Sequence, residues 1–133
     1  MNEANENPSQ LAPLSLAHLG DAVYELYVRN RVIHEHPTMP AHKLHLQTVK
    51  YVKAHAQSNS INAIMEILTD DEIAVFRRGR NAKSYTVPKN ANLGDYHRAT
   101  GFEALMGYLY LMGDVERLEF IMDKAFINAI DTV

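Results

Sequence analysis

Apolar residues recur at spacings of three and four along most of the chain, which is the period of an amphipathic α-helix. The first such segment begins near Leu14. Its apolar positions predict one long helix with a polar stripe: Leu16, Leu19, Val23, Leu26, Tyr27 and Val32. The HEHPTMP segment at 34–40 then interrupts the pattern, because each proline disfavours helix for the residue before it. Pro40 is suited to the first position of the next helix.

The middle of the chain predicts three shorter helices. A helix is expected at about 40–57, and the polar residues that follow it are suited to cap a short helix: Ser58, Asn59 and Ser60. Thr69 and Glu72 have the spacing of a capping box, which predicts a helix at about 70–78. Gly79 is expected to end that helix.

The last third of the chain predicts a long loop and two helices. Residues 79–94 combine glycine, proline, asparagine and cations without apolar periodicity, which is typical of a loop. Asp95 is the expected N-cap of a helix that is apolar on most sides and ends at Gly113, and Asp114 is the expected cap of the last helix. Because no segment alternates apolar and polar residues, the fold class is expected to be all-α.

The length and composition indicate one globular domain. The chain has 133 residues, 47% of them apolar, and residues 1–13 form a polar segment with two prolines. We therefore expect a flexible tail at 1–13 and a single domain at 14–133. The absence of cysteine excludes disulfides, thiolate metal sites and a cysteine nucleophile. The sequence shows no secretory signal and no apolar run long enough to span a membrane, so the simplest interpretation is a cytoplasmic protein that is not associated with a membrane.

Positive charge is concentrated in one part of an otherwise acidic chain. The net charge is −3, yet residues 77–98 hold six cations and one acid. Guanidinium, ammonium, amide and hydroxyl groups together suit phosphate oxygens, so we expect this segment to bind RNA or another polyanion. The alternative is a merely solvated, charged loop. The candidate RNA-binding residues are Arg77, Arg78, Arg80, Asn81, Lys83, Ser84 and Lys89.

Asp21 and Glu103 are acids in apolar helical surroundings, where an unpaired carboxylate is costly. Asp21 follows Gly20, whose missing side chain leaves room for another backbone or a ligand. Glu25 lies one turn later and either adds negative charge for a hard cation or pairs with Arg29. Glu103 either binds a metal or forms a salt bridge to Arg98 or Lys83. The histidines match no metal-binding motif.

Three motifs, LAHLGDAVYE at 16–25, RRGRNAKSYTVPKN at 77–90 and FEALMGYLYL at 102–111, resemble the ribonuclease III catalytic domain, and in particular the shortened Mini-III ribonucleases. The resemblance implies a helical bundle that acts as a homodimer and cuts double-stranded RNA, leaving 5′-phosphate and 3′-hydroxyl ends. Asp21 and Glu103 match the catalytic, magnesium-binding acids, with Mn²⁺ as a substitute. The expected substrate is the 23S (large-subunit) ribosomal RNA precursor, with a large-subunit ribosomal protein as a candidate partner.

The chain departs from the longer ribonuclease III enzymes at two positions. Ala17 and Thr100 stand where those enzymes have further carboxylates, so we expect a centre with fewer acids and more water around the metal. Glu25 and Thr100 are candidates for supporting roles around it. We also expect the catalytic domain alone, without the double-stranded-RNA-binding domain of the larger enzymes, and therefore RNA contacts from 77–90.

Two other functions are compatible with parts of the sequence. A non-catalytic RNA-binding or ribosome-assembly module of the same fold would keep the cationic segment but has little reason to keep two costly acids. A hydrolase of small phosphate esters leaves the long cationic loop unexplained and would carry a His-Asp signature that is missing here.

Overall fold

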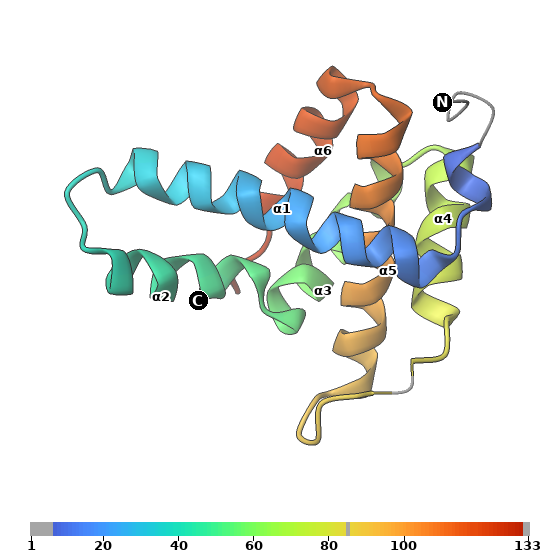
Figure 1. Ribbon diagram of the computed structural model, residues 1–133, viewed down its shortest axis with the longest axis horizontal. Helices are drawn as coiled ribbons and strands as arrows, with labels where there is room; N and C mark the ends of the chain where they lie inside the picture. The colour runs from blue at the N-terminus through green and yellow to red at the C-terminus, as the bar shows by residue number, and fades with distance from the viewer. Residues whose placement is uncertain (1–6, 85, 132–133) are drawn as a thin grey trace.

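The computed structural model describes residues 7–84 and 86–131, and every regular element within them is a helix. The all-α prediction is therefore confirmed. Figure 1 shows α5 at the centre, crossed by α1 and flanked by α4, with α2 running beside the outer half of α1. The elements are η2 (Pro8–Gln10), α1 (Pro13–Glu35), α2 (Ala41–Val52), α3 (Ala54–Ile64), η3 (Met65–Ile67), α4 (Asp70–Asn81), α5 (Leu93–Met112) and α6 (Val115–Ile127).

Helix α5 is the core of the domain, as its apolar sequence predicts. Phe102, Leu105 and Met106 are completely buried, and α5 packs against α1, α4 and α3. The helix ends at Gly113, which adopts a left-handed conformation with φ of 76°. None of the described helices is long and apolar enough to cross a membrane.

Two glycines allow α1 and α5 to cross with their backbones in contact. A Cβ atom on Gly20 would overlap the Glu103 carbonyl oxygen and lie 2.7 Å from the Gly107 nitrogen. A Cβ atom on Gly107 would overlap the Leu16 carbonyl oxygen in the same way. Any larger residue at either position would force the helices apart.

The buried face of α1 differs from the predicted one. Leu26 is 71% exposed, although the sequence pattern places it on the apolar stripe. The residues that are buried follow a line of mostly four-residue steps: Leu16, Ala17, Gly20, Tyr24, Val28 and Val32. That line faces the crossing with α5, so the tightest contact sets the rotation of α1 and leaves Leu26 on the outside.

Two predicted helix ends are wrong, for different reasons. The helix expected at 40–57 ends at Val52, because Lys53 adopts an extended conformation with ψ of 156°, and Ser58 lies inside the next helix. Helix α4 continues past Gly79 to Asn81. Gly79 does not end the helix but allows α4 to pack closely against α5, since a Cβ atom there would lie 2.7 Å from the Ala104 Cβ.

The helix starts in the second half of the chain agree better with prediction. Thr69 and Glu72 form the expected capping box, and Asp114 caps α6. Asn92 caps α5 in place of Asp95, whose backbone N–H donates to the Asn92 side chain at 2.9 Å. At the N-terminus, η2 forms within the segment expected to be a tail, of which residues 1–6 lie outside the described part.

Replacing Gly20 by alanine is expected to destabilise the protein by about 1–3 kcal/mol, because the new methyl group overlaps the backbone of α5. Chemical denaturation measures the change. Gly94→Ala is the control, since its Cβ meets side-chain ends and no backbone, the Arg98 guanidinium at 3.1 Å and the Asn92 Oδ1 at 3.3 Å, and should change the free energy of unfolding little. Equal stability of the Gly20→Ala variant and the wild type would show that the close crossing is not required.

Candidate active site

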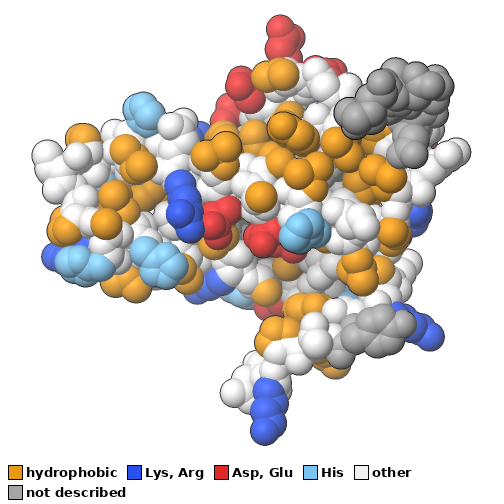
Figure 2. All heavy atoms as spheres, viewed as in Figure 1, with side chains coloured by type: hydrophobic (Ala, Val, Ile, Leu, Met, Phe, Trp, Pro, Cys, Tyr) orange, Lys and Arg blue, Asp and Glu red, His pale blue; other side chains and the backbone are white. Residues whose placement is uncertain are grey.

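The backbone contact between α1 and α5 brings Asp21 and Glu103 together. Asp21 directly follows Gly20, and Gly20 lies against the carbonyl group of Glu103 itself. The two carboxyl groups are within hydrogen-bonding reach of each other. Asp21 is exposed and Glu103 is half-buried, so the pair opens to solvent on one side. Figure 2 shows acidic side chains at the surface near the middle of the face that α1 crosses.

The surroundings of Glu103 favour its neutral form. Burial raises the pKa of Glu103 to about 8, and the negative charge of Asp21 adds to the shift. Near neutral pH the Glu103 carboxyl group therefore holds a proton in the absence of another cation. A divalent cation between them would replace that proton and remove the repulsion.

Gln57 on α3 is a member of this site that no sequence motif indicates. Its side chain is 2% exposed, and its Nε2 donates to the Glu103 Oε2 at 3.4 Å and to the Val52 carbonyl oxygen at 2.9 Å. The hydrogen bond to Glu103 lowers the pKa of that carboxyl group, against burial and Asp21. Only the packing of α3 on α5 reveals this contact.

The two residues expected to support the site are engaged with other partners. Glu25 forms an ion pair with Arg29 at 2.7 Å, which is the simpler of its two interpretations, although its charge still raises the pKa of Glu103. The Thr100 hydroxyl donates to the Tyr96 carbonyl oxygen at 3.0 Å. Ala17 is buried, so that turn of α1 offers no carboxylate.

The alternative of a salt bridge for Glu103 is not what the structure shows. Arg98 donates instead to the Ser58 hydroxyl at 2.6 Å and to Asp95 at 3.2 Å, and Glu103 has no ion pair among the described residues. Among the residues that the structure describes, no group of three or more His, Asp or Glu side chains lies close enough together to hold a metal ion. Two carboxylates with open solvent beside them fit a hard cation that keeps several waters, such as Mg²⁺.

The cationic segment comprises the end of α4, a loop and the start of α5. Arg77, Arg78, Arg80 and Asn81 belong to α4, Lys83 and Lys89 lie on the loop at 82–92, and Arg98 belongs to α5. Arg77, Lys83 and Lys89 are exposed, the half-buried Arg80 packs over the Phe76 ring, and Arg80 also donates to Asn81 at 3.1 Å.

Arg78 has a structural contact that the sequence does not suggest. Its guanidinium donates to the carbonyl oxygens of Ser9 and Leu11, and so holds the N-terminal segment against α4. The Arg78 side chain is exposed, but its donors serve the protein backbone. Among the candidate RNA-binding residues, the structure therefore favours Lys83 and Lys89 over Arg78.

Side chains at the start of α5 anchor the loop at 82–92. The Tyr96 hydroxyl contacts both the Ser84 hydroxyl and the Thr86 carbonyl oxygen at 3.1 Å. His55 bridges Asp95 and Asp131 through its two ring nitrogens, each at 3.0 Å, and these contacts raise its pKa. Since α5 begins at Leu93, the loop leaves the helix about 15 Å along its axis from Glu103, at 1.5 Å per residue.

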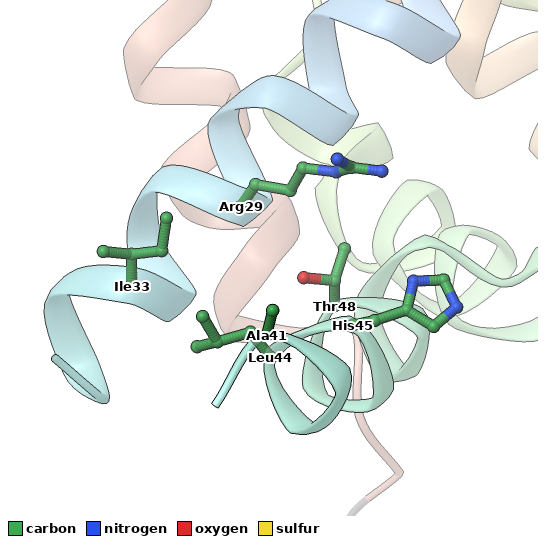
Figure 3. Close-up of a pocket in the computed structure, with 6 residues that line it drawn as sticks. All are labelled: Arg29, Ile33, Ala41, Leu44, His45 and Thr48. Carbon is green, nitrogen blue, oxygen red and sulfur yellow. The ribbon is translucent and has the colours of Figure 1, made fainter. Parts of the chain in front are cut away.

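A separate cleft lies between α1 and α2. Figure 3 shows Arg29 and Ile33 on one wall and Ala41, Leu44, His45 and Thr48 on the other. Its lining is mainly apolar and contains no carboxylate, so neither Asp21 nor Glu103 belongs to it.

Comparisons with known proteins place this geometry in a family. Residues 14–114 match the model of the Ribonuclease III domain. The chain is 51% identical over 119 residues to Mini-ribonuclease 3 of Clostridium tetani, covering 90% of this chain and 78% of that protein. It is 49% identical to Mini-ribonuclease 3 of Thermoanaerobacter sp., covering 89% of this chain and 82% of the relative.

A solved structure has the same architecture. A crystal structure of a protein from Fusobacterium nucleatum superimposes with a TM-score of 0.77 at 27% identity, covering 86% of this chain and 90% of that one. The chain thus belongs to the ribonuclease III family as an endoribonuclease of the Mini-ribonuclease 3 type.

Proposed function

We propose that this protein is a magnesium-dependent endoribonuclease that cleaves double-stranded RNA at a centre formed by Asp21 and Glu103. The observation that carries the proposal is the backbone contact between α1 and α5 at Gly20, which brings the carboxyl groups of Asp21 and Glu103 near enough to act on each other. One exposed and one half-buried carboxyl group held side by side are a ready site for Mg²⁺, or for Mn²⁺ in its place.

Each residue of the proposed site has a separate role. Asp21 and Glu103 bind the cation, and Gln57 holds the Glu103 carboxyl group from the buried side. When bound, the cation supplies Lewis-acid chemistry: it activates water and neutralises charge on the phosphate, giving 5′-phosphate and 3′-hydroxyl ends. The exposed side of Asp21 leaves the site open to a large substrate.

Asp21→Asn and Glu103→Gln are each expected to lower kcat on a duplex RNA by on the order of 100-fold or more, because each removes a charged ligand while keeping the side-chain shape. Cleavage is followed on gels with Mg²⁺ and with Mn²⁺, and RNA binding is measured in EDTA. Glu25→Gln is the matched control and should keep most of the activity, since Glu25 is paired with Arg29. Full activity of Asp21→Asn would exclude this centre.

The loop at 82–92 is our proposed contact with the RNA backbone. Lys83 and Lys89 project from a loop anchored at the start of α5, and Figure 2 shows cationic side chains projecting from the lower end of the molecule, away from the acidic surface. Duplex RNA presents two phosphate backbones across a shallow minor groove, so such a loop recognises shape rather than base sequence.

Lys83→Ala and Lys89→Ala should each weaken duplex binding and reduce the slope of log affinity against log salt by about 1, because each lost phosphate contact releases one counterion fewer. Titrations in EDTA at several salt concentrations measure both quantities. Lys124→Ala is the control: it removes an exposed cation on α6 and should change neither the affinity nor the slope. Unchanged slopes for both loop variants would exclude the loop as the RNA contact.

We also propose that the protein is a homodimer that associates through a groove between α1, α5 and α6. The groove has a volume of about 580 Å³ and is lined in part by Val23, Leu26, Tyr110, Leu118 and Met122. Figure 2 shows hydrophobic side chains gathered over the region between α1 and α6. Contiguous exposed apolar surface of this kind marks association sites, and a second copy of the chain buries it symmetrically.

Light scattering should give a mass of twice the 15.1 kDa of the chain, and Leu26→Glu should reduce it to one chain without unfolding, because Leu26 is 71% exposed. Leu46→Glu is the control, since Leu46 is 60% exposed on α2, away from the groove. A dimer that persists in the Leu26→Glu variant would place the interface elsewhere.

The natural substrate is proposed from the family resemblance alone. The resemblance to Mini-III ribonucleases implies that the substrate is the 23S ribosomal RNA precursor, which the enzyme cuts during its maturation, and that a large-subunit ribosomal protein is a candidate partner. The retained pair of acids supports the enzyme over a non-catalytic RNA-binding module, because such a module has no use for two carboxyl groups held together against their repulsion.

A further inference from the structure

The orientation of the Gln57 side-chain amide is determined by its two neighbours. Both groups that its nitrogen contacts, the Val52 carbonyl oxygen at 2.9 Å and the Glu103 Oε2 at 3.4 Å, are acceptors. Rotating the amide by half a turn would put its oxygen against both of them. Gln57 is therefore held with its NH₂ group toward Glu103.

The break between α2 and α3 creates the acceptor that holds the amide. Lys53 leaves the helical conformation, so the Val52 carbonyl at the end of α2 lies among the groups that a helix end leaves unpaired. Gln57 satisfies this carbonyl with one hydrogen and keeps the other for Glu103. The corner between α2 and α3 is thus connected through one side chain to the acid on α5.

A buried glutamine at this position has a cost in stability. The Gln57 Oε1 is buried and has no hydrogen-bond partner among the described residues. An unsatisfied buried acceptor costs about 1–3 kcal/mol. An apolar side chain of similar size would avoid that cost, but it would leave the Val52 carbonyl and the Glu103 carboxyl group without their shared donor.

We propose that Gln57 is a positioning residue for the cation site: its Nε2 fixes the Glu103 carboxyl group beside Asp21 in the arrangement that binds the divalent ion. This inference rests on the proposed metal-dependent function. Without the amide, repulsion from Asp21 and Glu25 would let the Glu103 side chain turn away.

The test is the affinity of the RNA-free protein for Mn²⁺, measured by electron paramagnetic resonance, in Gln57→Met and Gln57→Leu variants. Both variants keep the bulk of the side chain and remove the hydrogen-bond donor. Two variants are used so that the test still holds if one of them does not fold. We expect the Mn²⁺ dissociation constant to rise by roughly 10–100-fold, as for other groups that orient metal ligands. The Mn²⁺ concentration for half-maximal cleavage should rise equally, with an unchanged KM for RNA.

Ser60→Ala is the matched control on the same helix. Ser60 is completely buried and donates to the Ala125 carbonyl oxygen on α6 at 2.6 Å, so its loss should lower the melting temperature and leave Mn²⁺ affinity unchanged. Wild-type Mn²⁺ affinity in both Gln57 variants would overturn the inference alone. Equal losses of affinity in the Gln57 and Ser60 variants would overturn it too, because they would indicate a general effect of packing. A wild-type protein that neither binds Mn²⁺ nor cleaves RNA would overturn the proposed function as well.

Discussion

The contact between the backbones of α1 and α5 is the constraint on which the rest of the structure depends. Gly20 and Gly107 are the positions where any side chain would separate the two helices. Each glycine costs about 1 kcal/mol of helix propensity relative to alanine. In return, Asp21 and Glu103 meet although 82 positions separate them in the sequence. A greater distance between the helix axes would leave two isolated acids in place of one site.

In the proposed site, the two acids are held together before any cation arrives. Glu103 is half-buried beside another acid, which raises its pKa to about 8, and Gln57 opposes that shift through its hydrogen bond. Three helices thus each contribute one side chain to the site: Asp21 from α1, Gln57 from α3 and Glu103 from α5. Because a cation binds the folded chain far better than the unfolded one, it should offset the repulsion built into the metal-free protein.

Local signals in the sequence predicted the parts of the structure that local forces decide. The Thr69 and Glu72 capping box and the Gly113 end of α5 depend on residues close in the chain, and both were predicted correctly. The motifs around Asp21 and Glu103 indicated both acids, and the fold brings them close together, while their role as metal ligands belongs to the proposed function. The face of α1, the break at Lys53 and the contacts of Gln57 and Arg78 depend on distant packing, and no local pattern contains them.

The arrangement of cations in this acidic protein supports the proposed binding of both a metal and RNA. Arg29 is paired with Glu25, Arg98 with Asp95, and Arg78 with the backbone of the N-terminal segment. None of these arginines neutralises Asp21 or Glu103, so the pair keeps its negative charge for an external cation. Lys83 and Lys89 lie on the loop that enters α5 at Leu93, and Leu93 is about 15 Å along the helix from Glu103. In the proposed function, the attraction for the RNA backbone is thereby separated along α5 from the pair of acids.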